Sequence, residues 1–385
     1  MCIRDSTYLA KNGTTGQIDY RGTDFSTVFQ SAINALPADG GTISIAKGEF
    51  VISTKITITK NYVTIMGLGD ASYLKATLAD YMIEFNGISY GRIENLRIRN
   101  YDVTGKAIRV ANSYHVWIVN NYLMGGGTKN THGIALSGVA DCHVIGNTLA
   151  NFGVMFSVMN IKRTDIIGNS GENVFDSVID SSGYWYDCIV ALNSFDVNKK
   201  TGYGYMFRDT GRNLRIIGNS VYNINQTGAW AIRLYENDAG ALSNVVIGYN
   251  TVKNCTRGIT IAGDASNIFE NIEVSGNIFD DISDLVLSIN YAKNITVHDN
   301  QFLSGTFSIA NSQDLKIHDN TGFVTENGGT ATVANGEYIA HGLDSSLNIG
   351  ASNSTVLITE YTKVYDGVPV TVGCDFVNAT HIRVS

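Results

Sequence analysis

Hydrophobic and polar positions alternate along most of this chain, and the alternation recurs in short units that each end in asparagine. Five and three residues before each asparagine the side chains are mostly apolar, whereas the residue between them varies. A period of two is typical of a strand with one buried face, and a repeat of this length predicts a solenoid. The asparagines are Asn121, Asn147, Asn169, Asn193, Asn219, Asn250, Asn277, Asn300 and Asn320.

Two further strands belong to each unit. An apolar residue follows two positions after most of the asparagines, so the chain turns at the asparagine and begins another strand. A third strand comes earlier in each unit, for example at 133–136 and 231–234. Three strands per unit predict an all-β parallel β-helix of about twelve coils spaced by about 4.8 Å, right-handed like most parallel crossovers. Because asparagine accepts left-handed backbone angles and its amide can bond to the next coil, we expect an asparagine ladder at this corner.

The two ends of the chain depart from the repeat. Apolar residues at helical spacing between Asp24 and Pro37 predict a capping helix over 24–36, which covers the open end of a β-helix spanning 11–327. Residues 1–10 fit no pattern, and we expect them to be an artefact or disordered. After 327 the repeat fades, and the turn signals at 335–336 (NG) and 366–367 (DG) predict a small C-terminal β module over 328–385. The chain stops inside a predicted strand, so we expect this module to be truncated.

Composition narrows the range of partners. The formal net charge of −8 argues against nucleic acid or an anionic membrane surface as partner, and no stretch is long enough to span a membrane. The five cysteines and seven histidines form no metal-ligand spacing, so we predict no metal site and no cofactor, with calcium use left open.

Several stretches resemble the entry to pectate-lyase-like β-helix proteins: 11–20 (KNGTTGQIDY), 32–36 (AINAL), 40–43 (GGTI) and 48–50 (GEF). That superfamily includes polysaccharide lyases, polygalacturonase-like hydrolases, sugar epimerases and phage tailspikes. The resemblance implies a right-handed β-helix that binds carbohydrate, but it does not choose a reaction. The chain lacks both the paired-aspartate and Gly-His-Gly pattern of polygalacturonases and the Asp-Pro-His-Glu pattern of mannuronan epimerases. Near the C-terminus, 340–343 (AHGL) and 365–370 (YDGVPV) resemble terminal modules of extracellular or tail-fibre proteins.

In proteins with this fold the ligand groove runs along the first strand of each coil, and charged residues gather there in the middle coils. The candidates for catalysis are Arg208, Asp209, Arg233, Tyr235, Glu236 and Asp180. The repeat places Arg208 beside Tyr235 and Asp209 beside Glu236, about 4.8 Å apart at the backbone. Asp180 matches an inward column, where an unpaired charge is costly. Either its pKa is raised for catalysis or the strand ends early, and the turn-like sequence 180–183 (DSSG) favours the early end.

Two chemistries fit these residues. An arginine, Arg208 or Arg233, neutralises the carboxylate of a uronic acid while Tyr235 or an arginine removes the adjacent proton, which gives metal-independent β-elimination. Alternatively, Asp209 and Glu236 act as general acid and base in hydrolysis. We place the lyase slightly ahead. The competing interpretation is that these charges form surface ion pairs across coils, which are common and weakly stabilising.

The sequence therefore predicts an extracellular or cell-surface protein that binds and cleaves a polysaccharide, with no nucleic acid partner. Substrate contacts are expected from Arg109, Lys129, Tyr184, Trp185, Tyr203 and Trp230. The alternative is a non-catalytic surface or tailspike-like adhesin, and the oligomeric state is left open between monomer and homotrimer. An adhesin that trimerises through its rod predicts an exposed apolar face, for which the candidates are Met155, Ile179, Met206, Ile189 and Val246.

Overall fold

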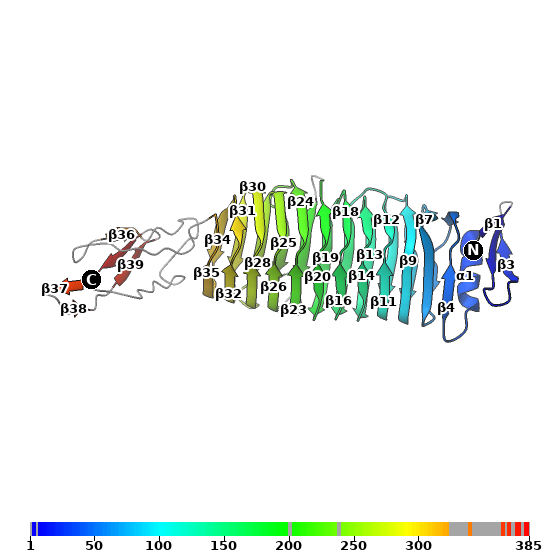
Figure 1. The fold of residues 1–385 in the computed structure, drawn as a ribbon, viewed down its shortest axis with the longest axis horizontal. Coiled ribbons are helices and arrows are strands. Elements are labelled where there is room, and N and C mark those ends of the chain that lie inside the picture. Colours follow the sequence, from blue (N-terminus) through cyan, green and yellow to red (C-terminus); the bar gives the residue numbers. More distant parts are fainter. Residues whose placement is uncertain are drawn as a thin grey trace.

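A computed structural model describes residues 2–4, 7–198, 202–236, 240–322, 338–340, 363–365, 368–370, 374–378 and 381–384. Within them the chain forms an all-β parallel solenoid whose 32 strands belong to one continuous hydrogen-bonded sheet. Figure 1 shows the coils stacked in a single row between β4 and β35. About ten coils are complete, slightly fewer than predicted, because the coils at both ends lack one of their three strands.

Each coil has three strands, and each strand pairs in parallel with its counterpart in the next coil. The first strands are β6 (Ile56–Ile58), β8 (Tyr81–Asn86), β10 (Lys106–Ala111), β13 (His132–Ala140), β16 (Val154–Lys162), β19 (Ser177–Tyr186), β22 (Tyr203–Arg208), β25 (Trp230–Tyr235), β28 (Arg257–Ala262), β31 (Leu285–Asn290) and β34 (Thr306–Ala310). The second strands are β4 (Gly41–Ser44), β7 (Val63–Ala76), β9 (Ser89–Asn100), β11 (Tyr114–Val119), β14 (His143–Ile145), β17 (Asp165–Ile167), β20 (Ile189–Ala191), β23 (Thr210–Ile217), β26 (Leu242–Gly248), β29 (Phe269–Ser275), β32 (Ala292–His298) and β35 (Gln313–His318). The third strands are β5 (Gly48–Ile52), β12 (Tyr122–Met124), β15 (Thr148–Ala150), β18 (Ser170–Glu172), β21 (Ser194–Asp196), β24 (Ser220–Ile224), β27 (Thr251–Cys255), β30 (Ile278–Ile282) and β33 (Gln301–Phe302), and β7 and β9 run on into this position.

The core consists of apolar columns that run along the rod. Ile108 pairs with Ile134, Ile118 with Val144, and Leu123 with Leu149, and all six are at most 1% exposed. A strand with alternating side chains buries one face, so stacking such strands in register produces a continuous interior. The predicted strand periodicity is confirmed.

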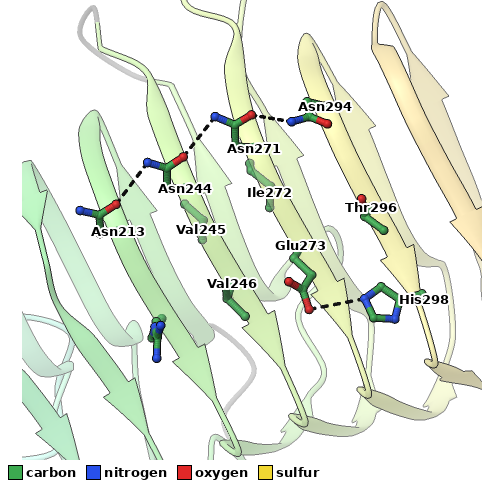
Figure 2. Close-up of a pocket in the computed structure, with 11 residues that line it drawn as sticks. Asn213, Asn244, Val245, Val246, Asn271, Ile272, Glu273, Asn294, Thr296 and His298 are labelled. Atoms are coloured by element: carbon green, nitrogen blue, oxygen red, sulfur yellow. Dashed lines mark hydrogen bonds and ion pairs between the residues drawn. The ribbon is translucent and has the colours of Figure 1, made fainter.

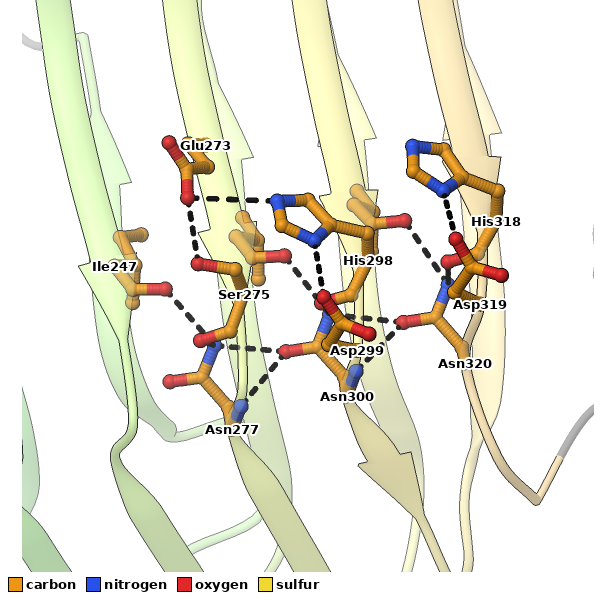
Figure 3. Close-up of polar contacts among 12 residues, drawn as sticks. Ile247, Glu273, Ser275, Asn277, His298, Asp299, Asn300, His318, Asp319 and Asn320 are labelled. Carbon is orange, nitrogen blue, oxygen red and sulfur yellow. Dashed lines mark hydrogen bonds and ion pairs between the residues drawn. The ribbon is translucent and has the colours of Figure 1, made fainter.

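The asparagine ladder is also confirmed. Asn219 Nδ2 donates to Asn250 Oδ1 (3.0 Å) and to the Val190 carbonyl (2.8 Å), while the Asn219 backbone N–H donates to the same Oδ1 (2.9 Å). Figure 3 shows this arrangement for the last rungs, Asn277, Asn300 and Asn320. The left-handed backbone conformation belongs to the residue before each rung, not to the rung itself as we expected. Those preceding residues are Asn120, Gly146, Gly168, Leu192, Gly218, Tyr249, Gly276, Asp299 and Asp319.

A capping helix covers the N-terminal end of the solenoid, as predicted (Figure 1). Helix α1 (Phe25–Ala35) begins after Asp24, whose side chain accepts a hydrogen bond from the Thr27 backbone N–H (2.8 Å). Its Phe25 ring lies 4.7 Å from that of Phe50 in β5. Strands β1 (Cys2–Arg4), β2 (Thr7–Lys11) and β3 (Ile18–Gly22) form an antiparallel sheet. Residues 7–10, which we expected to lie outside the fold, are therefore part of a strand.

Short strands are described near the C-terminus. The strands β36 (Tyr338–Ala340), β40 (His381–Val384) and β39 (Cys374–Asn378) form an antiparallel sheet in that order. A second antiparallel pair, β37 (Lys363–Tyr365) and β38 (Val368–Val370), flanks the turn signal at 366–367. The other turn signal, at 335–336, lies outside the described residues, and the boundary at 327 and the truncation stay predictions. In the described part of the chain no helix is both long and apolar enough to cross a membrane.

Candidate active site

The candidate site lies on the outward face of the first strands, in the middle coils. One outward column contains Arg109, Ala135, Ser157 and Asp180, and Met206 pairs in turn with Asp180 and with Arg233. Asp180 thus points outward, and the prediction of an inward position or an early strand end is wrong, because β19 continues to Tyr186.

The error is a register shift of two residues in β16 and of one residue in β19. Met155 lies opposite Gly133, the position that the sequence pattern assigned to Gly153, and Ile179 lies opposite Phe156 in an inward column; both side chains are 0% exposed. A slip of one residue moves every side chain of a strand to the opposite face. The apolar face predicted for an adhesin therefore loses Met155 and Ile179, and Met206 is only 8% exposed. Ile189 and Val246 are half-buried on the second strands.

Four predicted residues meet on this face. Arg208 forms an ion pair with Asp180 of the preceding coil and stands in register with Tyr235 of the next coil, as predicted. The Arg233 guanidinium carbon lies 3.8 Å from the centroid of the Tyr235 ring, and that of Arg208 lies 5.8 Å from it. The result is a row of alternating charge with an aromatic ring held between two arginines.

Burial changes the ionisation of the groups in this row. Burial raises the pKa of Tyr235, although Arg208 and Arg233 oppose the shift. For Arg208, burial disfavours the charge, but the charge of Asp180 and its hydrogen bond outweigh burial and raise the pKa. Neither group is suited to remove a proton near neutral pH, because both hold their own protons more tightly than usual.

Asp176 and His132 join the cluster from the start of the first strands. Burial raises the pKa of Asp176, and the charge of Asp180 raises it further, whereas Lys129 and Arg208 lower it. Burial and the charge of Lys106 lower the pKa of His132, whose Nδ1 is buried with no hydrogen-bond partner among the described residues. Asp176 is thus a half-buried carboxyl group whose pKa lies above its usual value.

Sequence reasoning gave Asp176 no role, because its burial depends on a segment far from it in sequence. The backbone of the loop at 125–131 passes directly over Gly153. A Cβ placed at Gly153 would lie 2.1 Å from the Lys129 carbonyl oxygen. Asp176 donates its backbone N–H to the Gly153 carbonyl (2.8 Å), so Lys129 is brought close to the Asp176 side chain. The predicted contact of Lys129 with a substrate stays a prediction.

Asp209 and Glu236 each bind a backbone N–H group. Asp209 is 8% exposed, has a left-handed backbone (φ 71°) and accepts a hydrogen bond from the Gly183 N–H (2.7 Å). Glu236 accepts one from the Gly240 N–H (3.0 Å). Asp209 also lines a shallow pocket of about 420 Å³ with Tyr184, at the corner between the first and second strands. These contacts indicate that both carboxylates stabilise turns.

The prediction that Trp185 contacts the substrate is wrong. Its side chain is 1% exposed and its ring packs edge-on against Phe207 at 4.9 Å. The neighbouring Tyr184 lies on the second-strand side of the corner, in register with Thr210, and its ring stacks on Tyr186 at 5.0 Å. Tyr184 is therefore exposed to a ligand in the corner pocket rather than in the first-strand groove.

The other predicted contacts already have protein partners. Arg109 forms an ion pair with Glu84 (3.0 Å), so the competing interpretation of ion pairs across coils holds at this position and at Arg208. The Tyr203 hydroxyl accepts a hydrogen bond from Gln226 Nε2 (2.8 Å). Trp230 is 7% exposed, and the Arg257 guanidinium carbon lies 5.1 Å from its ring centroid. No group of three or more histidine, cysteine or acidic side chains among the described residues is arranged to hold a metal ion.

Comparisons with known proteins agree on the architecture. No family model matches the chain, and no curated protein matches its sequence. The structure is similar to that of the family 28 exopolygalacturonase of Yersinia enterocolitica, with a TM-score of 0.57 and 10% identity over 75% of this chain and 74% of that one. It is also similar to the endo-xylogalacturonan hydrolase of Aspergillus tubingensis (TM-score 0.53, 13% identity, 81% and 93%) and to the Dettilon tailspike protein (0.55, 16%, 78% and 66%). The chain therefore has the right-handed parallel β-helix fold of pectate-lyase-like proteins.

Proposed function

We propose that this protein binds a polysaccharide along the first-strand face and hydrolyses it, with Asp176 as general acid and Asp180 as general base. The observation that carries the proposal is the difference between the two carboxyl groups. Burial raises the pKa of Asp176, whereas Asp180 is ion-paired with Arg208. Glycoside hydrolysis uses two carboxyl groups whose environments differ in this way, one as general acid and the other as general base or nucleophile.

In the proposed reaction Asp176 donates its proton to the glycosidic oxygen as the bond to the anomeric carbon breaks. Asp180 takes a proton from the water that attacks this carbon, so one water molecule is consumed and one new reducing end appears. Arg208, Arg233 and Tyr235 bind the flanking sugar. Asp176 and Asp180 are four residues apart on one chain segment, up to about 13 Å between backbones at roughly 3.3 Å per residue. The stereochemical outcome depends on the distance between the two carboxyl groups in the complex with the glycan, about 5 Å for retention and about 6.5–9.5 Å for inversion.

β-Elimination of a uronic acid polymer is the second candidate, and it is now less favoured than the sequence suggested. Because the pKa values of Tyr235 and Arg208 are raised, neither side chain is suited to take the proton from the sugar in β-elimination. The arginine pair still supports an acidic sugar as ligand. A protein that cleaves a polymeric glycan is expected to act outside the cell or at its surface. The oligomeric state is open between monomer and homotrimer.

The test combines two readouts on a panel of neutral and uronic-acid polysaccharides. Reducing ends report hydrolysis or elimination, and the ultraviolet absorbance of an unsaturated uronate reports elimination alone. Asp176→Asn should abolish the release of reducing ends, whereas Asp319→Asn, a matched change at a side chain 67% exposed, should not. Absorbance that persists in Asp176→Asn would replace hydrolysis with elimination. Binding without either product would favour the adhesin.

A further inference from the structure

A second groove lies on the outward face of the second strands, away from the first-strand site. It has a volume of about 520 Å³ and spans β23, β26, β29 and β32. Four asparagines, Asn213, Asn244, Asn271 and Asn294, form one rim, one from each strand or its adjoining turn (Figure 2). We call this feature the lateral groove.

The rim asparagines form an exposed ladder of amides. Asn244 Nδ2 donates to Asn213 Oδ1 (3.2 Å), Asn271 to Asn244 (3.1 Å) and Asn294 to Asn271 (2.6 Å). Each amide has two N–H donors and two acceptor lone pairs. The ladder occupies one donor each of Asn244, Asn271 and Asn294, and Asn213 Nδ2 donates to Asp187 Oδ1 (2.6 Å). The remaining donors and lone pairs repeat at the coil spacing of about 4.8 Å along the rim.

The backbone alone does not require asparagine at these positions. All four rim residues have left-handed backbone angles, with φ between 54° and 56°. The same corner in other coils holds Tyr62, Tyr90 and Arg163, also with left-handed angles. The run of four amides is therefore a property of this stretch of the rod and needs a reason other than backbone geometry.

The floor of the groove is a row of side chains in register. Arg215 is followed by Val246, Glu273 and Thr296 on successive strands, and His298 lies two residues beyond Thr296 on the last strand. Arg215 is exposed, and its guanidinium has no ion pair or hydrogen bond to the other described residues. At the other end His298 Nε2 lies 3.4 Å from Glu273 Oε1, and His298 Nδ1 lies 2.7 Å from Asp299 (Figures 2 and 3). An unpaired guanidinium beside a row of free amide donors provides an interface for hydroxyl and carboxylate oxygens.

We propose that the lateral groove binds a linear, hydroxyl-rich polysaccharide parallel to the rod axis, with one sugar per coil. The coil spacing is close to the length that one pyranose unit adds to an extended glycan, so successive amides meet successive sugars. Arg215 donates to a carboxylate or hydroxyl of the sugar at its end. This groove holds the polymer on one face while the first-strand face acts on it, so the inference takes its ligand class from the proposed function.

The experiment compares two double variants of the same chemistry. Asn244→Gly with Asn271→Gly removes the central rim amides, and glycine tolerates the left-handed backbone. Asn223→Gly with Asn254→Gly is the matched control. These two residues also form an exposed amide pair (2.7 Å) with left-handed backbones (φ 61° and 52°), but they do not line the groove. Melting curves of both variants verify that each remains folded.

Binding is measured by affinity electrophoresis in gels that contain polygalacturonate, alginate, xylan or mannan. We expect the groove variant to lose at least about tenfold in affinity for a retarding polymer, a change of about 1.4 kcal/mol. The control should bind like the unchanged protein. If all three proteins are retarded equally, or if no polymer retards any of them, the proposal that the lateral groove binds polysaccharide is overturned.

Cleavage assays on the same proteins separate this inference from the proposed function. A groove variant that loses retardation but still cleaves short oligosaccharides supports both. Retardation that depends on the groove, without any cleavage by the unchanged protein, supports the groove and rejects hydrolysis. If instead the groove variant cleaves polymers and oligosaccharides as fast as the unchanged protein and is retarded equally by the gel, that result supports hydrolysis and rejects polysaccharide binding in the lateral groove.

Discussion

Replacing a rung of the buried asparagine ladder should weaken the solenoid far more than its small change in volume suggests. We choose Asn219→Ala, because this rung lies mid-rod, is 1% exposed and lacks the left-handed backbone that would penalise alanine. Its side chain donates to Val190 and Asn250 and accepts from both the backbone and the side chain of Asn193.

The expected loss follows from these four bonds. Alanine leaves the buried Asn193 backbone N–H without its acceptor, which costs about 1–3 kcal/mol, and each remaining bond contributes about 0.5–1.5 kcal/mol. Asn250 Oδ1 keeps its bond from the Asn219 backbone N–H, so that acceptor is not orphaned. Because bonds in one network are not additive, we expect a total loss near 3–5 kcal/mol.

Hydrogen exchange followed by mass spectrometry is the appropriate assay, because long repeat arrays do not always unfold in a single step. In peptides that cover 188–221, a loss of 3–5 kcal/mol would speed amide exchange by roughly 100- to 1,000-fold or more. Peptides from 81–100, several coils away, serve as the internal control. A change of less than about tenfold in 188–221 would refute the argument that ladder bonds are stronger because they are buried.

Four further predictions address the site. Because Asp176 must be protonated to act as an acid, activity should fall as pH rises through its raised pKa, above the usual 3.8, and a pH–rate profile of kcat/KM measures this basic limb. Arg208→Lys keeps the charge but loses the planar contact with Tyr235, so it should lower kcat/KM about tenfold without moving the basic limb. Trp185→Ala should destabilise the fold by about 3–5 kcal/mol in chemical denaturation, whereas Trp185→Phe should leave polysaccharide affinity unchanged, since the ring packs on Phe207. A chelator should leave cleavage rates unchanged, and a dependence restored by calcium would refute that expectation.

The fold could be predicted because the same pattern of apolar residues before an asparagine recurs in coil after coil. Nine coils show mostly apolar residues five and three positions before an asparagine, and a strand explains that pattern wherever it occurs. One misaligned coil does not change the conclusion. The number of coils was less certain, because the strands at both ends of the rod lack a partner on one side and lose the pattern.

The site was harder to predict because it depends on the register of single coils. Gly133 and Gly153 look equivalent in sequence, yet in the structure Gly133 is matched by Met155, two residues further on. In the next coil a shift of one residue reversed the predicted faces of Ile179 and Asp180. The sequence pattern of one chain cannot resolve shifts of one or two residues in coils whose first strands carry small and apolar residues at neighbouring positions.

Trp185 did leave a signal that sequence reasoning missed. It matches Ile161 in the preceding coil and Gly211 in the next one, and the apolar match indicates an inward position. Its tyrosine neighbours on both sides point outward by the same alternation. An aromatic triplet on a strand therefore divides into one core ring and two surface rings, and only the surface rings are available to a ligand.

The buried ladder and the rim ladder share the bond from one asparagine amide to the next, but among the described residues only the buried rungs also bond to the backbone. This difference and their different burial indicate different roles. In the interior, Asn219 and its neighbours have no water to compete with, so each lost bond appears as lost stability. On the rim of the lateral groove, Asn244 and Asn271 exchange their bonds with water at little cost, so their removal should hardly affect melting. If the rim asparagines serve binding, substitutions in the two ladders should have separate effects, one on stability and the other on polysaccharide binding. Asn219→Ala should accelerate hydrogen exchange while the remaining folded protein still binds polysaccharide, and Asn244→Gly with Asn271→Gly should lose binding while the rod stays intact. A rim variant that melts as early as Asn219→Ala would instead make both ladders structural.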